Sequence, residues 1–229
     1  MAVADLDLVD LVGNRTMSPQ IGATLAAFAA ERRSFLVCAV PRLAGKSTVM
    51  AAMLDCVPEG TPVRWLARHP NDVEQLPAQQ PGGYLVVPEI SQAPVPGYIW
   101  GEPVRNVFSL LARGYSLATA LHAPGVDEAF EVLTRDNGVS DEQAARLELF
   151  VYIRSLGDDW RSPTRRVIAA VHEIDGVTDG RPNVRLLHRW DEATDTFEQV
   201  TAARRLAADD LDARATDLLR ATAGRSGDT

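Results

Sequence analysis

A strand-like apolar run that leads into Gly45-Lys-Ser-Thr48 limits most strongly what this chain can fold into. The run, Phe35–Val40, has the continuous apolar character of a central strand in a parallel sheet. Residues 46–56 then carry apolar side chains on one helical side. A loop between such a strand and a helix N-terminus suits phosphate, because its backbone N–H groups point outward and the helix dipole favours an anion. The sequence therefore predicts a phosphate-binding loop, in which a lysine reaches the terminal phosphates and a hydroxyl holds magnesium.

Lys46 and Ser47 fit these two roles, although the loop departs from the full pattern GxxxxGK[ST]. Its first position holds Val40, and a β-branched residue resists the positive φ that glycine adopts easily. The alternative is a chance tetrapeptide at a helix start, with Lys46 a solvated side chain; the strand–loop–helix context favours the nucleotide interpretation. Leucine and alanine also replace the small, flexible residues usual in the middle of such loops. The predicted cofactor-binding residues are Pro41, Arg42, Leu43, Ala44, Gly45, Lys46, Ser47 and Thr48.

Strand-like and helix-like segments alternate through the first 136 residues. Ser18 followed by Pro19 is typical of a helix start, with the serine as cap. Residues 104–111 carry an apolar stripe at helical spacing. Alternating strands and helices predict an α/β core with a mainly parallel sheet. The remaining apolar runs that we expect in this sheet are residues 63–66, 84–87 and 117–121.

The pattern changes after about residue 136. Ser140 followed by Gln143 forms a capping box that opens a helix. Turn-rich intervals then separate further strand-like runs, which predicts antiparallel hairpins, and residues 202–220 are helix-prone. The expected hairpin strands are residues 150–156, 166–174 and 184–190.

Two polar residues follow apolar strands further along the chain. Residues 84–88 lead into Glu89, and residues 117–121 lead into His122. A carboxylate at a strand end beside a phosphate loop can face magnesium or an attacking water. Taken singly, Glu89 is more often a solvated loop residue, and a lone His122 is more often a hydrogen-bonded packing residue. If the nucleotide interpretation holds, Lys46, Glu89 and His122 converge on one cleft at the carboxyl ends of the strands.

Composition restricts the remaining function classes. A formal net charge of −8 argues against the excess of basic residues that general nucleic-acid binding requires. Cys38 and Cys56 have neither a CxxC pair nor a histidine cluster beside them, which favours reduced, buried thiols over a disulfide or a zinc site. No apolar run approaches the roughly 20 residues needed to cross a bilayer, and the acidic start lacks the basic region of a signal peptide. We therefore expect a cytoplasmic protein.

Taken in order, the motifs resemble the motor domain of type II/type IV secretion and pilus-assembly ATPases, most closely the tight-adherence pilus branch. The similarity covers nearly all of the chain. It implies a RecA-like P-loop NTPase core with a mainly parallel sheet and C-terminal antiparallel hairpins, in one domain over residues 1–229. Within that domain we expect an N-terminal remnant (1–17), a nucleotide-binding core (18–136) and a C-terminal helix and hairpin portion (137–229). The segments that carry the resemblance are residues 10–19, 35–50, 85–90, 114–123 and 151–191.

The resemblance also implies roles, cofactors and partners. ATP and Mg²⁺ would be the cofactors, with Lys46 and the loop amides on the phosphates and with Ser47 and Glu89 on the metal. Glu89 would also position the attacking water, and His122 would sense the γ-phosphate, so that the predicted catalytic residues are Lys46, Glu89 and His122. The partners would be further copies of the chain or components of a secretion or pilus machine, at most peripheral to the inner membrane.

The chain departs from the family at several points. Ala67 and Arg68 stand where the family has an acidic box that helps to activate water, and the stretch from there to Glu89 is short and lacks the expected arginines. Ser91 and Gln92 follow Glu89 where an arginine is usual. These departures predict slow turnover, and they leave open a degenerate, non-catalytic paralogue that acts as a nucleotide-binding or regulatory subunit. A kinase acting on a small molecule would need a substrate lid, which we do not identify.

Overall fold

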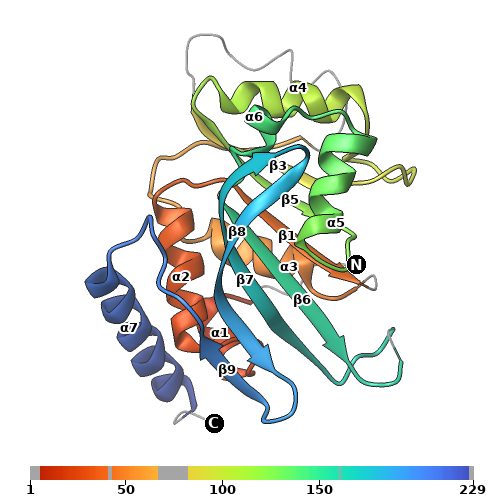
Figure 1. Cartoon of the computed structure of the whole chain (residues 1–229). Coiled ribbons are helices and arrows are strands. Elements are labelled where there is room, and N and C mark those ends of the chain that lie inside the picture. The colour runs from red at the N-terminus through yellow and green to blue at the C-terminus, as the bar shows by residue number, and fades with distance from the viewer. Residues whose placement is uncertain (1–5, 41–42, 67–81, 160, 227–229) are drawn as a thin grey trace.

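The structure, a computed structural model, describes residues 6–40, 43–66, 82–159 and 161–226 and is built around one mixed sheet (Figure 1). The strands follow the order β2-β3-β5-β1-β6-β7-β8-β9, and β4 pairs with β3. The strands are β1 (Phe35–Val40), β2 (Val63–Trp65), β3 (Gly83–Ile90), β4 (Tyr98–Ile99), β5 (Tyr115–Leu121), β6 (Leu149–Leu156), β7 (Arg165–Thr178), β8 (Arg181–Asp191) and β9 (Thr196–Gln199).

The helices lie between and around these strands. They are α1 (Leu8–Gly13), α2 (Pro19–Ala30), α3 (Lys46–Leu54), α4 (Glu102–Leu111), α5 (Val126–Glu131), α6 (Asp141–Ala144) and α7 (Ala208–Ser226), with a π-helical turn, η2 (Val132–Asp136), continuing α5. None of the helices in the described part of the chain is long and apolar enough to span a membrane.

The predicted switch from a parallel to an antiparallel arrangement is confirmed. The pairs β2–β3, β3–β5, β5–β1 and β1–β6 are parallel, whereas β6–β7, β7–β8 and β8–β9 are antiparallel. The hairpins extend the same sheet, because β6 pairs with β1 on one side and with β7 on the other. The long β7–β8 hairpin therefore runs beside the nucleotide-binding half of the molecule that the sequence predicts (Figure 1).

Helices cover both faces of the parallel strands, which explains why these strands are apolar throughout. Alternate residues of β1 point to opposite faces: Phe35 and Val37 pack under α1, α2 and α3, whereas Leu36 and Cys38 pack under α4, α5 and α6. Both cysteines are free, as expected. Cys38 is fully buried, while Cys56 is half-buried and burial raises the pKa of its thiol to about 11.

Helix starts agree with the capping residues in the sequence. The Ser18 hydroxyl accepts from the backbone N–H of Ile21 at the start of α2. At α6, Ser140 and Gln143 form the expected reciprocal capping box. These signals are local, and for that reason a sequence pattern is enough to find them.

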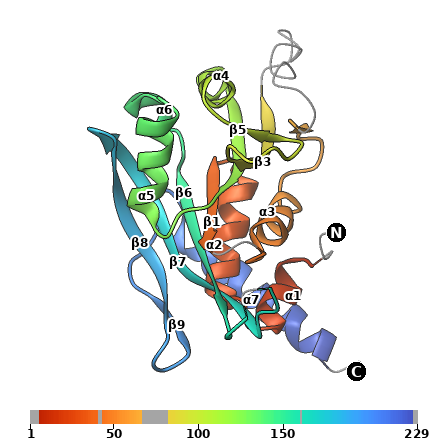
Figure 2. The ribbon, with the colours of Figure 1, turned by 90° about the vertical axis from the view of Figure 1, so that its right-hand side faces the viewer.

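The two ends of the chain differ from expectation. Within the expected N-terminal remnant (1–17), the sequence indicates no helix, yet α1 forms there with Asp7 and Asp10 as a capping box. The α1 helix is stabilised from far along the chain, because Arg225 of α7 pairs with both aspartates. Figure 2 shows α7 lying along α1 and α2. The C-terminal helix begins at Ala208 and not at residue 202, since residues 204 and 205 are held outside the helix by Glu173.

Candidate phosphate-binding site

The loop that joins β1 to α3 has an irregular backbone in the places where the sequence places a phosphate-binding loop. Val40 is the last residue of β1 and pairs with Arg154 of β6, so the first position of the motif is extended strand. The positive φ values fall on Leu43 (65°) and on Gly45 (93°). Val40 therefore does not need the left-handed conformation that glycine adopts easily. Among the described residues of the loop, the strained non-glycine residue is Leu43. Two predicted binding residues, Pro41 and Arg42, lie outside the described residues.

Gly45 sets the start of α3. It is the N-cap in the left-handed region and provides no side-chain cap, so the first N–H groups of α3 have no intrahelical partner and are available to a ligand. A Cβ at Gly45 would lie 3.0 Å from Cδ of Arg166, which shows how closely another segment approaches the loop. Lys46 follows as the first residue of α3 and is buried, whereas the hydroxyl-bearing residues Ser47 and Thr48 are exposed and half-buried, respectively.

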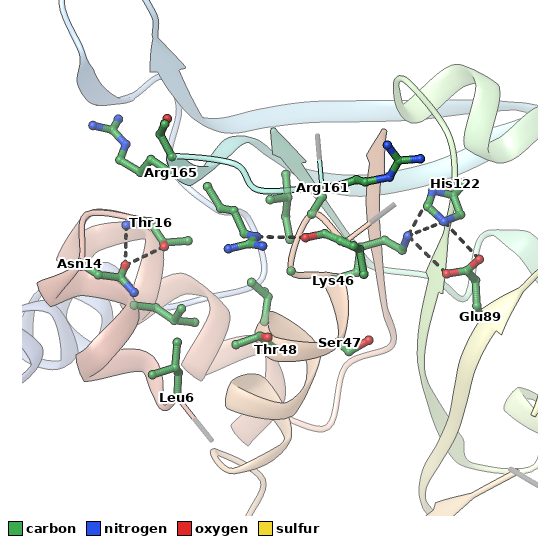
Figure 3. A pocket seen from close by; sticks show the side chains of 18 of the residues that line it. Leu6, Asn14, Thr16, Lys46, Ser47, Thr48, Glu89, His122, Arg161 and Arg165 are labelled. Atoms are coloured by element: carbon green, nitrogen blue, oxygen red, sulfur yellow. Dashed lines mark hydrogen bonds and ion pairs between the residues drawn. The ribbon is translucent and has the colours of Figure 1, made fainter. Parts of the chain in front are cut away.

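Three side chains from three elements meet beside this helix start (Figure 3). Lys46 Nζ lies 3.3 Å from Glu89 Oε2, near the carboxyl end of β3. Lys46 Nζ also lies 3.0 Å from Nε2 of His122, the residue after β5. His122 Nε2 is in turn 3.3 Å from Glu89 Oε1. The convergence predicted for Lys46, Glu89 and His122 is therefore present at the carboxyl edge of the parallel strands.

The ring of His122 contacts Ala39, Lys46 and Glu89. His122 Nδ1 lies 3.1 Å from the backbone oxygen of Ala39 and 3.3 Å from Lys46 Nζ. With a proton on Nδ1, the ring donates to the Ala39 oxygen. In the neutral ring Nε2 then accepts from the Lys46 ammonium group. In this tautomer Nε2 has no proton for Glu89, and Glu89 Oε1 is buried without a hydrogen-bond partner within the described residues.

Glu89 Oε1 is the atom against which a magnesium site can be tested, because its 3.3 Å contact with His122 Nε2 is an ion pair only when the ring is protonated. A buried carboxylate atom without a donor is costly, and a metal ion or a metal-bound water satisfies it. Glu89 lines the same cavity as Ser47, whose hydroxyl sits in the first turn of α3. Oxygen donors are the ligands that Mg²⁺ prefers, and it keeps several waters. The residues present therefore fit magnesium bound together with a phosphate chain.

The cavity around these residues has a volume of about 690 Å³. It is lined by the loop, the helix start and the residues just described, together with side chains from α1 and from the connection between β6 and β7. Within a chain of net charge −8, this cavity gathers Lys46, Arg161, Arg165 and Arg166. A cluster of cations in an acidic protein favours an anionic ligand here.

Sequence reasoning missed the three arginines. They precede or begin β7 and are separated from Lys46 by more than a hundred positions, and no motif marks them. Arg166 Nε donates to the backbone oxygen of Leu43 at 3.0 Å, across 123 positions of sequence. The one sequence signal for these arginines is an arginine-rich turn between two strands. Such a turn is more often a solvated hairpin than part of a binding site.

Of the expected departures from the family, the structure describes only the one after Glu89. Ala67 and Arg68 lie outside the described residues. Ser91 lies in the turn after β3, where its N–H donates to Ile99 and its hydroxyl accepts from the N–H of Ala93. The segment after Glu89 thus folds back on itself as β4, parallel to β3.

Comparison with family models finds no match, and comparison with curated proteins finds none either. Among solved structures, the chain is similar to the VirB11 ATPase from the Brucella suis type IV secretion system, in complex with sulphate, with 14% identity and a TM-score of 0.48. The similarity covers 64% of this chain and 51% of that one, so the chain matches about half the length of the solved structure. A likeness this distant assigns neither a site nor an activity to the chain.

Proposed function

We propose that the chain is a P-loop ATPase with a RecA-like core over residues 1–229, that it resembles the motors of type II/type IV secretion and pilus assembly, and that it turns over slowly. The observation that carries the proposal is the meeting of Lys46, Glu89 and His122 beside Gly45 and the start of α3. Phosphate transfer needs positioning and charge stabilisation more than covalent chemistry. A loop with available amides, a buried lysine and a buried carboxylate provides both.

Each residue has a role in this proposal. Lys46 gives up its contacts with Glu89 and His122 and pairs with the terminal phosphates, together with the backbone N–H groups of residues 43–48. Ser47 and Glu89 hold Mg²⁺, which supplies positive charge against the phosphate oxygens. Glu89, once released from Lys46, accepts a proton from the attacking water. His122, fixed by the Ala39 oxygen, senses the γ-phosphate.

The low turnover follows from what the sequence lacks. Acid–base assistance of the kind given by an acidic box is worth about 10²–10⁴-fold, and Ala67 and Arg68 do not provide it. A charge-stabilising arginine is worth about 10³–10⁵-fold in related transfers, and Ser91 and Gln92 stand where one is usual. Slow hydrolysis that is not rescued by a higher ATP concentration is the expected result.

A non-catalytic nucleotide-binding subunit is the second candidate. Two observations favour it: the left-handed φ of 65° at Leu43, which costs about 1–2 kcal/mol for a residue with a Cβ, and the contacts that already occupy Lys46. The strain at Leu43 costs stability, and the contacts of Lys46 have to break before it can bind a phosphate. In either case the partners would be further copies of the chain or parts of a secretion or pilus machine, and the location would be the cytoplasm, at most peripheral to the inner membrane.

Binding and hydrolysis measured on the same variants test the proposal. We expect the wild-type chain to bind ATP with Mg²⁺ and to hydrolyse it below roughly 1 s⁻¹, the lower end of common turnover numbers. Lys46→Ala should lose both activities, whereas Glu89→Gln should keep binding and lose hydrolysis by about 10²-fold or more. Glu198→Gln, an exposed carboxylate on β9, is the matched control and should change neither.

The possible outcomes separate the candidates. The non-catalytic subunit would be favoured if Lys46→Ala abolishes ATP binding but the wild-type chain shows no hydrolysis that depends on Lys46. Turnover of several per second that depends on Lys46 would show that other groups replace the missing ones, and the slow-motor proposal would be wrong. No nucleotide binding by the wild-type chain would remove the ATPase and the nucleotide-binding subunit, and would leave a degenerate partner or regulatory subunit.

A further inference from the structure

The connection between β6 and β7 passes directly over the candidate phosphate loop. It brings Arg161, Arg165 and Arg166 into the cavity that Lys46 lines. The side chain of Arg166 lies against the loop backbone, with Nε 3.0 Å from the Leu43 oxygen and Cδ 3.0 Å from the position that a Cβ at Gly45 would occupy. This hairpin therefore forms a second wall of the same cavity.

The charge of Arg165 is compensated by a carboxylate. Its two terminal nitrogens pair with the carboxylate of Asp195, and its guanidinium lies over the ring of Trp190. The Asp195 carboxylate raises the pKa of Arg165, and in return the arginine holds the pKa of Asp195 well below its usual range. Arg165 thus fastens the hairpin to the turn after β8.

Arg166 is bound differently. Its hydrogen bond to Leu43 uses Nε, and within the described residues no carboxylate lies within ion-pair distance of it. The guanidinium fork suits phosphate oxygens, because its terminal N–H groups diverge in one plane. Arg166 is half-buried, and its hydrogen bond through Nε keeps that fork at the loop.

Arg161 lines the cavity on another side. Figure 3 shows its guanidinium extending toward the end of the cavity where His122 lies, away from Arg165. Lys46, Glu89, His122 and Arg161 all line this cavity. The end where His122 lies is the one at which the terminal phosphate would sit if Lys46 takes its proposed role.

We propose that Arg161 and Arg166 contact the phosphate chain of the bound nucleotide within the same chain, as a cationic wall opposite Lys46. The inference rests on the proposed function, and it names the residues that supply the positive charge missing beside Glu89. Arg166 contacts the phosphates nearer the loop backbone, and Arg161 contacts the terminal phosphate. The ligand class is accordingly a nucleoside triphosphate, and not a monophosphate.

A purely structural role is the rival explanation for Arg166. In that case its hydrogen bond would only brace the strained backbone of Leu43, and the phosphates would never touch it. The two explanations differ in two readouts. A phosphate contact makes the lost affinity grow with the number of phosphates and reduces the salt dependence of binding, because one screened charge pair disappears. A brace would change neither.

The experiment compares equilibrium binding of ATP, ADP and AMP to the full chain, with Mg²⁺, at several salt concentrations. Arg166→Ala and Arg161→Ala are the test variants, and Arg166→Gln replaces Arg166→Ala if the alanine variant does not fold. Arg189→Ala, which removes an exposed arginine paired with Glu198 away from the cavity, is the matched control. We expect each test variant to weaken ATP binding on the order of 10-fold, which is what loss of one hydrogen bond to a charged group gives.

The loss should be smaller for ADP and smallest for AMP, and the dependence of ATP affinity on salt should become shallower. Arg161→Ala should spare ADP more than Arg166→Ala does. Test variants that behave as Arg189→Ala would overturn the proposal, and so would an equal loss for all three nucleotides with an unchanged salt dependence. Wild-type chain that binds no ATP would remove the proposed function itself, whereas binding that only Lys46→Ala abolishes would remove this inference alone.

Discussion

At the scale of single residues, the candidate site depends on backbone conformations that few side chains accept. Gly45 has a φ of 93° and is the N-cap of α3. A Cβ at this position would lie 3.0 Å from Cδ of Arg166. Leu43 takes a left-handed conformation without being glycine. The strain is local to the loop that a ligand would touch, which is where proteins commonly keep such strain.

Gly45→Ala should therefore separate backbone strain from site geometry. The left-handed φ should cost about 1–2 kcal/mol in the free energy of unfolding, and the new methyl group should displace Arg166 from Leu43. Urea unfolding and ATP binding measure the two effects. Gly60→Ala is the control, because Gly60 has a φ of 80° with nothing within 4 Å of the added Cβ. Gly60→Ala should lower the free energy of unfolding by a similar amount and leave the affinity for ATP unchanged. An equal affinity for ATP in the Gly45→Ala and Gly60→Ala variants would contradict the close approach of Arg166.

At the scale of elements, the segment before α7 is anchored by one buried carboxylate. Glu173 of β7 is fully buried. It accepts from the backbone N–H groups of Arg204 and Arg205, at 2.7 and 3.1 Å, and from the Arg205 side chain at 3.0 Å. This bonding delays the start of α7 and directs it across α1 and α2.

Glu173→Ala should destabilise the chain by about 3 kcal/mol, because it leaves buried donors without their acceptor and Arg205 without its partner. Chemical unfolding measures the loss, and hydrogen exchange should show the largest increase in α7 and in α1, which is tied to α7 through Arg225. Glu198→Ala breaks an exposed pair with Arg189 and should cost less than about 1 kcal/mol. Equal losses in the two variants would show that Glu173 is not an anchor.

At the scale of the whole molecule, stability should depend on pH through a buried histidine. His188 of β8 is buried, and burial lowers its pKa from the ordinary value of 6.5 to about 4. Its Nε2 lies 2.9 Å from the Thr24 hydroxyl of α2. Since that hydroxyl donates to the Gln20 oxygen, the ring donates through Nε2 and is neutral in the folded state. Protonation opposes the packing of α2 on the sheet.

The sign follows from proton binding. Between pH 6.5 and about 4 the unfolded chain binds a proton at His188 that the folded chain does not, so the free energy of unfolding falls as the pH falls. The loss should reach about 3 kcal/mol, at 1.36 kcal/mol for each pH unit. Burial lowers the pKa of His172 as well, which adds in the same direction. Urea unfolding of wild type and His188→Gln over this range measures it; parallel pH profiles would contradict the assignment.

The sequence by itself determined the order of the main elements and the meeting of three candidate site residues. Continuous apolar runs, helical stripes and caps act over a few residues, so the parallel strands, the hairpins and the starts of α2 and α6 follow from local pattern. Lys46, Glu89 and His122 were found for a related reason. Each follows an apolar strand, and the carboxyl ends of neighbouring parallel strands lie at one edge of a sheet.

Tertiary structure alone decided what lies opposite that edge. No local pattern relates Arg166 to Leu43, which are 123 positions apart, or Arg225 to Asp7, which are 218 positions apart. Those contacts arise because β6 joins the hairpins to the parallel strands, so that the β6–β7 connection passes over the loop, and because Glu173 directs α7 onto α1. The strands of a sheet can be recognised from their own residues, but which loops cross the sheet depends on the packing of the whole chain.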